Sequence, residues 1–311
     1  MQTEKRCASR GAALILLLAF AVGTKGATQS SDGVSSPALP VVDSSWPVVN
    51  LNVAVLDKDG TPHKIDEREF QLFEDGAARP LQFRDSPDSQ VSLALVIDSS
   101  GSLFKRKQEM ISAVTAIIKS MPPDSEVMAV TFAGQAFLDL PFTPASKVDI
   151  SFLDRLLDRG PTAIYDAVFA AEDYIVAHAK YPRRALVILS DGEDNASHVS
   201  RRNVFWKMHQ PGAPMVYVCL DSRARFMQNE LVAGHMNLKF LAKEGGGTHF
   251  NLDPDPASAA AHIVAAVRGQ YVLEFTATNP ARNGKAHKLE VRLPVKDVQI
   301  HALPVYNSPA K

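Results

Sequence analysis

The sequence predicts an α/β fold, in which a doubly wound, mostly parallel sheet is inserted in a small β-sandwich formed by the N- and C-terminal segments. Apolar strands alternate with amphipathic helices over residues 88–268, a rhythm typical of a parallel sheet covered on both faces. Short strands with period-two alternation occupy residues 48–83 and 271–303. Because a sheet of so few strands is only marginally stable in water, we expect these two segments to pack together.

The pattern of apolar residues places the individual elements. In the first β segment, residues 49–55 and 70–73 alternate, and turns are expected at Asp59-Gly60 and Asp75-Gly76. The inserted unit has expected strands at 91–97, 126–132, 185–189, 215–220 and 248–252 and helices at 104–120, 163–179, 201–209, 226–244 and 257–268. The last strands are expected at 271–276, 287–293 and 298–303. The domains are therefore expected at 46–86 and 269–305 for the sandwich and 88–268 for the inserted unit.

The N-terminus indicates export. Lys5, Arg6 and Arg10 precede an apolar run at 12–22, as in a secretory signal peptide. A permanent anchor is the weaker interpretation, because the run is far shorter than the ~20 residues of a membrane-spanning helix. We therefore expect a signal peptide at 1–27, a flexible lead rich in Ser, Gly, Pro and Thr at 28–45, and a secreted or periplasmic, envelope-associated product.

Composition and charge narrow the class of protein. Hydrophobic residues make up 46% of the chain and charged residues 22%, which is ordinary for a soluble globular protein. The formal net charge is −1, so no long-range positive field attracts nucleic acid. Nucleic acid is accordingly excluded as an expected partner, and no membrane span is expected after the signal is removed.

Three loops carry oxygen-bearing side chains that can meet at one edge of the sheet. Asp98, Ser100 and Ser102 follow the apolar strand at 91–97, and Asp191 follows the strand at 185–189. Thr162 lies at the expected start of a helix. Ligands of doubly wound sheets bind outside the carboxyl ends of the strands, and hard cations such as Mg²⁺ prefer oxygen ligands. The alternative for the first loop is that Asp98 and Ser100 only cap the following helix.

These residues resemble the metal-ion-dependent adhesion site of the von Willebrand factor A family, in which Asp-x-Ser-x-Ser is joined by a separate Thr and a separate Asp. The resemblance implies that Ser100 and Ser102 bind the metal directly, and Asp98 directly or through water. It implies that Thr162 binds directly or through water and that Asp191 acts mostly through water. The cofactor would be Mg²⁺, Mn²⁺ or Ca²⁺. The stretch at 69–76 also resembles one that precedes the A domain in related bacterial proteins.

The resemblance implies a metal-dependent adhesion or protein-binding module, whose cation coordinates an Asp or Glu of a protein partner. A structural or assembly protein of the cell envelope, in which the metal only stabilises the loops, is the alternative. A hydrolase is a weaker one, since Asp98 stands where the nucleophile motif Gly-x-Ser-x-Gly has its first glycine. The sequence also lacks a phosphate-binding Gly-x-x-x-x-Gly-Lys-Ser/Thr loop and a His-Glu-x-x-His motif. We therefore expect a protein that is not an enzyme.

Overall fold

The computed structural model describes residues 46–101, 106–156, 160–220, 228–251 and 255–310, and it confirms the predicted fold class. A six-stranded sheet has the order β10-β9-β8-β5-β6-β7. All neighbours in it are parallel except β6 and β7. Its strands are β5 (Ser92–Asp98), β6 (Glu126–Phe132), β7 (Ala136–Pro144), β8 (Arg184–Leu189), β9 (Met215–Leu220) and β10 (His249–Asn251).

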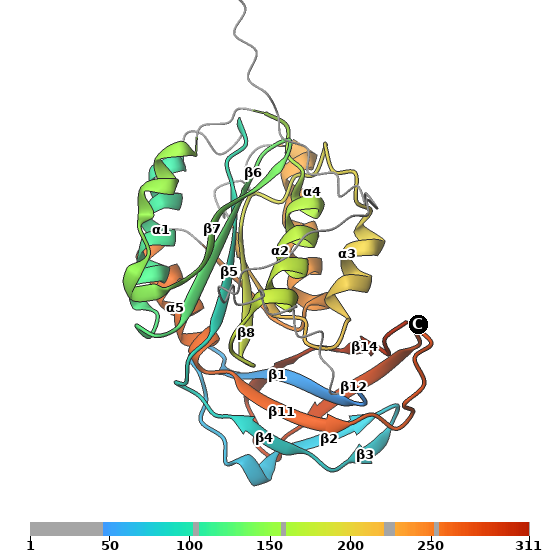
Figure 1. Cartoon of the computed structure of the whole chain (residues 1–311). Coiled ribbons are helices and arrows are strands. Elements are labelled where there is room, and N and C mark those ends of the chain that lie inside the picture. Colours follow the sequence, from blue (N-terminus) through green and yellow to red (C-terminus); the bar gives the residue numbers. More distant parts are fainter. Residues whose placement is uncertain (1–45, 102–105, 157–159, 221–227, 252–254, 311) are drawn as a thin grey trace, which may run out of the picture. The chain divides into compact units, whose positions relative to one another are not determined.

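Helices cover both faces of this sheet (Figure 1), with α1 and α5 on one face and α2, α3 and α4 on the other. The helices are α1 (Lys107–Ser120), α2 (Ile164–His178), α3 (Arg201–Met208), α4 (Gln228–Glu244) and α5 (Pro256–Arg268). Every residue of β5 is buried, with Leu95 packing among one set of helices and Val96 among the other. Within the described ranges, no helix is long and apolar enough to cross a membrane.

The antiparallel strand β7 was not identified from the sequence. It lies at the edge of the sheet, where Phe137 and Leu138 are both exposed and therefore break the alternation that marks a half-buried strand. Its two prolines, Pro141 and Pro144, also argued against a strand, although an edge position tolerates them because one side of the strand donates no ladder hydrogen bonds. Short 3-10 helices in the described connections lie at Glu67–Glu69, Ala145–Lys147 and Ile150–Arg155.

The terminal segments form two antiparallel sheets with one shared core. One sheet has the order β13-β1-β11-β4 and the other β14-β12-β2-β3. Strands from the two ends of the chain alternate in the first sheet, and in the second they join where β12 pairs with β2. The N-terminal strands are β1 (Val48–Asp57), β2 (Gln71–Glu74), β3 (Ala77–Arg79) and β4 (Gln82–Asp85). The C-terminal strands are β11 (Tyr271–Thr276), β12 (Ala286–Arg292), β13 (Val298–Ala302) and β14 (Val305–Asn307). A common apolar cluster links them.

The Glu-Asp-Gly stretch at 74–76 holds this sandwich together. The carboxylate of Glu74 is buried, accepts hydrogen bonds from Tyr306 Oη at 2.5 Å and from the Thr278 N–H at 3.0 Å, and pairs with Arg79 Nε at 3.0 Å. These partners come from the other end of the chain and from the next strand. Asp75 and Gly76 then turn the chain with φ of 50° and 84°, a conformation that glycine adopts without strain. The motif therefore has a structural role.

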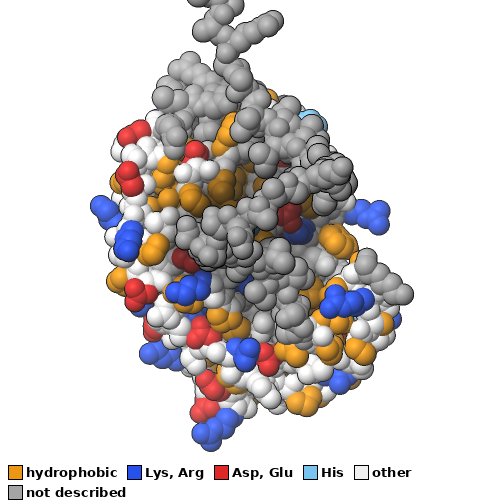
Figure 2. Space-filling model, in the orientation of Figure 1, with side chains coloured by type: hydrophobic (Ala, Val, Ile, Leu, Met, Phe, Trp, Pro, Cys, Tyr) orange, Lys and Arg blue, Asp and Glu red, His pale blue; other side chains and the backbone are white. Residues whose placement is uncertain are grey.

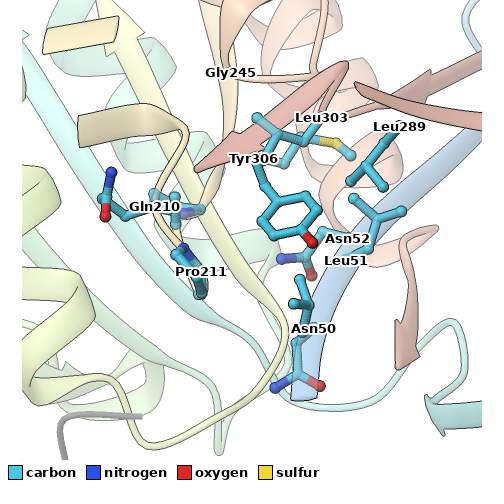
Figure 3. Close-up of a pocket in the computed structure, with 14 residues that line it drawn as sticks. Asn50, Leu51, Asn52, Gln210, Pro211, Gly245, Leu289, Leu303 and Tyr306 are labelled. Carbon is cyan, nitrogen blue, oxygen red and sulfur yellow. The ribbon is translucent and has the colours of Figure 1, made fainter. Parts of the chain in front are cut away.

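Strand β1 is buried on both faces. Val53 and Val55 point into the sandwich core, whereas Ala54 and Leu56 join the apolar core of the six-stranded sheet and its helices. Nearer the start of the strand, Asn50 and Asn52 face the 210–215 segment across a pocket of only about 10 Å³ (Figure 3). That volume leaves room for no more than about one water molecule, so the two layers are closely packed here.

A buried arginine also ties the inserted unit to the linker that precedes β5. Arg183 is fully buried, donates to the carbonyl oxygens of Ser89 (2.9 Å) and Ser86, and lies 3.5 Å from the Asp85 carboxylate. Burial lowers its pKa, and the carboxylates of Asp85 and Asp88 counteract this. A buried charge is costly unless it is paired, so these contacts favour one fixed path of the linker.

Glu172 on α2 is the least satisfied ionisable residue in the described part of the chain. Its side chain is completely buried, and neither carboxyl oxygen has a hydrogen-bond partner among the described residues. Burial raises the pKa of Glu172 to about 8, although the Lys207 ammonium on α3 acts in the opposite direction. Lys207 itself pairs with the exposed Asp173. Glu172 is therefore protonated in the folded chain at neutral pH.

This burial predicts a pH-dependent stability. Between pH 4.5, the ordinary value, and about 8, the unfolded chain has lost the Glu172 proton and the folded chain keeps it, so stability falls as pH rises through that window. A shift of this size corresponds to roughly 3–5 kcal/mol. The free energy of unfolding of wild type and of the Glu172→Leu variant can be measured in urea at pH 5 and at pH 8.5. The difference between variant and wild type should shift in favour of the variant by about that amount from the lower pH to the higher. Asp173→Asn serves as the exposed control, and an unchanged difference between the two pH values would contradict the prediction.

Candidate metal site

The two candidate carboxylates lie at the same edge of the sheet. β5 ends at Asp98 and its parallel neighbour β8 ends at Leu189, with Ile97 opposite Leu189 in the register. Asp191 therefore follows β8 within two residues, at the edge where Asp98 lies. Both side chains are buried, each residue being only 3% exposed.

Hydrogen bonds fix the orientation of the Asp98 carboxylate. The Ser100 N–H donates to its Oδ1 at 2.8 Å and the Ser190 hydroxyl donates to its Oδ2 at 2.6 Å. Ser190 in turn accepts from the Gly192 N–H at 3.0 Å, so the loop after β8 positions a residue of the loop after β5. Ser190 is not among the residues predicted from the sequence, where its only signal is its place directly before Asp191.

The electrostatics of the pair call for a positive charge. Burial, and after it the neighbouring Asp191 carboxylate, together raise the pKa of Asp98 to about 6, against the lowering effect of hydrogen bonds from Ser100 and Ser190. Two buried carboxylates repel each other unless a cation or a proton lies between them. Carboxylate and hydroxyl oxygens suit Mg²⁺, so the residues present fit a hard divalent ion.

Thr162 belongs to the same assembly of loops. Thr162 is only 2% exposed. Its N–H donates to Asn195 Oδ1 at 2.7 Å, and its carbonyl oxygen accepts from the Asn195 N–H at 2.9 Å. The next residue, Ala163, donates through its N–H to the Ala133 carbonyl oxygen in the turn between β6 and β7 at 2.8 Å. Asn195, which begins an Asn-x-Ser sequence typical of glycosylation sites, thus positions the Thr162 loop.

The start of α2, directly after Thr162, is capped from the loop that follows β8. Asp194 Oδ1 accepts from the Ile164 N–H at 3.1 Å, and the Ser197 hydroxyl accepts from the Tyr165 N–H at 3.0 Å. The residue at the cap position itself, Ala163, offers no side-chain hydrogen bond. Because capping satisfies the otherwise unpaired N–H groups of a first turn, these contacts fix the Thr162 loop relative to Asp191.

Helix α4 packs directly on the Asp191 loop through two glycines. Gly192 has φ of +86°, and a Cβ there would lie 2.1 Å from the Gly234 carbonyl oxygen. A Cβ on Gly234 would lie 2.6 Å from the Asp191 carbonyl oxygen. Neither position tolerates a larger side chain without displacement of the backbone, so the glycines allow α4 to hold Asp191 in place.

The structure thus places Asp98, Ser100 and Asp191 at one sheet edge, and the loop after β8 bonds both the Asp98 carboxylate and the loop that carries Thr162. Ser102 lies outside the described residues, as do the predicted signal peptide and lead. Over the part of the chain that is described, no three His, Cys, Asp or Glu side chains form a possible metal cluster. The candidate set therefore relies on hydroxyls beside its two carboxylates.

On the face shown in Figure 2, the Lys and Arg side chains of the described residues are interspersed with Asp and Glu side chains.

Comparison with known proteins finds one matching family model. The family model of the von Willebrand factor type A domain matches residues 93–193, which confirms the resemblance for that part of the chain. This range contains all of β5 except Ser92, the whole of β8 and all four described candidate ligands. No curated protein matches the chain.

Several solved structures are similar to the chain at low identity. An aerotolerance-related membrane protein from Bacteroides fragilis is 19% identical over 57% of this chain and 98% of its own, with a TM-score of 0.44. A von Willebrand factor type A protein from Catenulispora acidiphila is 12% identical over 86% and 74%, with a TM-score of 0.47. The PilB minor pilin from Streptococcus sanguinis is 15% identical over 60% and 62%, with a TM-score of 0.43. None of these likenesses says what this chain binds.

Proposed function

We propose that the chain, whose residues 93–193 match the von Willebrand factor type A domain, is an exported protein-binding module that works through one divalent cation. The observation that carries this proposal is the burial of Asp98 and Asp191 at one sheet edge, with the pKa of Asp98 raised by burial and by Asp191. Burying two like charges is costly without a compensating charge. A function that requires a cation explains why both carboxylates are there.

Five residues would hold the ion, which we expect to be Mg²⁺, Mn²⁺ or Ca²⁺: Asp98, Ser100, Ser102, Thr162 and Asp191. Three of these ligands are neutral hydroxyls, and the resemblance implies that Asp191 acts mostly through water, so the ligands in direct contact would compensate the charge of a divalent ion only in part. When bound, such an ion supplies a positive site that an Asp or Glu of a protein partner can coordinate. The chain's own part is to hold the ligands rigidly, through Ser190, Asn195 and the capping bonds at α2.

The alternative is a structural or assembly protein of the cell envelope, in which the cation serves only to relieve the repulsion between Asp98 and Asp191. Both functions use the same ligands, so they differ in what removal of the metal does. A hydrolase would need a base that activates a nucleophile, whereas the Asp98 carboxylate is engaged by the hydroxyls of Ser190 and Ser100 and by the Ser100 N–H.

Chelation tests the proposal. The full chain, used to capture proteins from the native envelope fraction, should retain a partner in Mg²⁺ and lose it in EDTA, while circular dichroism shows the same fold in both. The Asp98→Ala variant in Mg²⁺ should behave like wild type in EDTA. Loss of the fold in EDTA would favour the structural alternative, and metal-dependent turnover of a substrate would favour an enzyme.

A further inference from the structure

The loop between β11 and β12 carries the single Asn-Gly dipeptide of the sequence, Asn283-Gly284. Asn283 is exposed, and Gly284 has a φ of +69°. A Cβ built on Gly284 would meet no atom closer than 3.9 Å, so the space beside this peptide is open. Asparagine is a thermolabile residue, and a following glycine, which has no side chain, leaves its own main-chain nitrogen least hindered.

Two hydrogen-bond donors converge on the side-chain carbonyl oxygen of Asn283. The Lys285 N–H donates to Asn283 Oδ1 at 3.0 Å, and the Ser308 hydroxyl donates to the same atom at 2.8 Å. The other acceptor within reach of this hydroxyl, the Lys285 carbonyl oxygen, is farther away at 3.3 Å. Donors aimed at a carbonyl oxygen stabilise the negative charge that develops there when a nucleophile attacks its carbon. Because Ser308 is fully buried, one donor lies on the protein side while Asn283 stays open to water.

The same loop anchors the segment that contains β14. The Ser308 N–H donates to the Lys285 carbonyl oxygen at 2.8 Å. The preceding residue, Asn307, pairs with Ala286 on β12, and its N–H donates to the His209 carbonyl oxygen at 2.6 Å. The length of the main chain between Asn283 and Ala286 therefore decides whether this segment keeps its contacts.

We infer that Asn283 is a site of spontaneous modification, at which the Gly284 main-chain nitrogen attacks the side-chain amide carbon of Asn283 and closes a succinimide ring. The new C–N bond replaces the bond to the Asn283 side-chain nitrogen. That nitrogen leaves as ammonia, which takes up the Gly284 amide proton through solvent. A water molecule then opens the ring at either carbonyl and yields aspartate or isoaspartate. Nothing is oxidised or reduced, and water is the only co-reactant.

The two products should differ in their effect on the fold. Aspartate at position 283 keeps the length of the main chain, and its carboxylate can still accept hydrogen bonds from the Lys285 N–H and the Ser308 hydroxyl. Isoaspartate inserts an additional carbon into the main chain. It should therefore displace the Lys285 carbonyl oxygen from the Ser308 N–H and loosen β14.

Peptide mapping by mass spectrometry of the full chain, incubated near neutral pH, tests the inference. The peptide that contains Asn283 should exchange an amide NH₂ for OH and appear as separate aspartate and isoaspartate forms. Asn307, which is followed by Ser308 and is only 6% exposed, is the internal control and should stay unmodified. An unmodified Asn283 after long incubation would overturn the inference.

Two variants test the chemistry of the site. Ser308→Ala removes one donor and should slow the modification about fivefold, less than the 10²–10³-fold lost with such a donor in a closed active site. In urea, where both chains are unfolded, the two rates should be equal. Gly284→Ala places a side chain beside the attacking nitrogen and should lower the rate more than Ser308→Ala does. If folded Ser308→Ala reacted as fast as wild type or faster, loop flexibility would set the rate and the inferred role of the hydroxyl would be wrong.

Hydrogen exchange tests the consequence for the fold. Amides of β14 should exchange faster in the isolated isoaspartate form than in fresh wild type. Asn283→Asp is the matched control, because it carries the same new charge on a main chain of unchanged length, and its β14 should stay protected. Equal protection of β14 in the isoaspartate form and in Asn283→Asp would contradict the predicted loosening.

Discussion

Removing residues 46–86 should leave the C-terminal strands of the sandwich unprotected and prone to aggregation. β11 lies between β1 and β4, β13 pairs with β1, and β12 pairs with β2. Of the pairings that the described C-terminal strands make in the sandwich, the deletion leaves only the short ladder between β12 and β14. An isolated two-stranded ladder is marginal in water, and unpaired edges with apolar faces associate readily.

Hydrogen exchange on a chain truncated to residues 89–311 measures this effect. Amides of β11, which pair on both sides in the full chain, should exchange at nearly unprotected rates, a loss of several kcal/mol of local stability. A second truncation to 89–269 is the control. It loses the cover of Ala54 and Leu56 and the contact of Arg183 with Asp85, so it should be less stable than the full chain yet keep a protected parallel sheet. Full protection of β11 in residues 89–311 would show that the two β segments are independent.

The sequence was sufficient for the parts of the fold that follow a simple period. The buried strands β5, β6, β8 and β9 are continuous apolar runs, and the helices between them show one apolar face, so both kinds of element could be placed to within a few residues. β7 could not, because an edge strand needs neither strict alternation nor the absence of proline. The burial of both faces of β1 could not be predicted either, because the polar side chains of Asn50 and Asn52 suggest a face that is in contact with solvent.

The candidate ligands could be predicted because their spacing is a recognisable motif, whereas the residues that position them could not. Ser190, Asn195 and Gly234 act through contacts between loops that are far apart in sequence, up to 92 residues for Ser190 and Asp98. Nothing in a single sequence distinguishes such a serine or glycine from one in an ordinary turn. The buried Glu172 was missed for a related reason, since a glutamate on a helix normally faces solvent.

Asp98 and Asp191 should jointly hold one divalent cation. Each variant Asp98→Ala and Asp191→Ala deletes a carboxylate next to the ion, and loss of even a residue that only positions a ligand typically costs 10–100-fold in metal affinity. We therefore expect each change to weaken Mg²⁺ binding roughly a hundredfold or more. The apo protein should not lose stability in the same way, because removing one of two repelling buried carboxylates relieves their repulsion.

Isothermal titration calorimetry of Mg²⁺ into the full chain and the two variants, at a pH well above 6 so that Asp98 is ionised, tests this claim most directly. Asp139→Ala, a carboxylate on β7 that bonds Thr131, provides a matched control that should leave the affinity unchanged. We expect one ion per chain for wild type and for the control, and no measurable binding at the same concentrations for either variant. Equal Mg²⁺ affinity in wild type, Asp98→Ala and Asp191→Ala would contradict it.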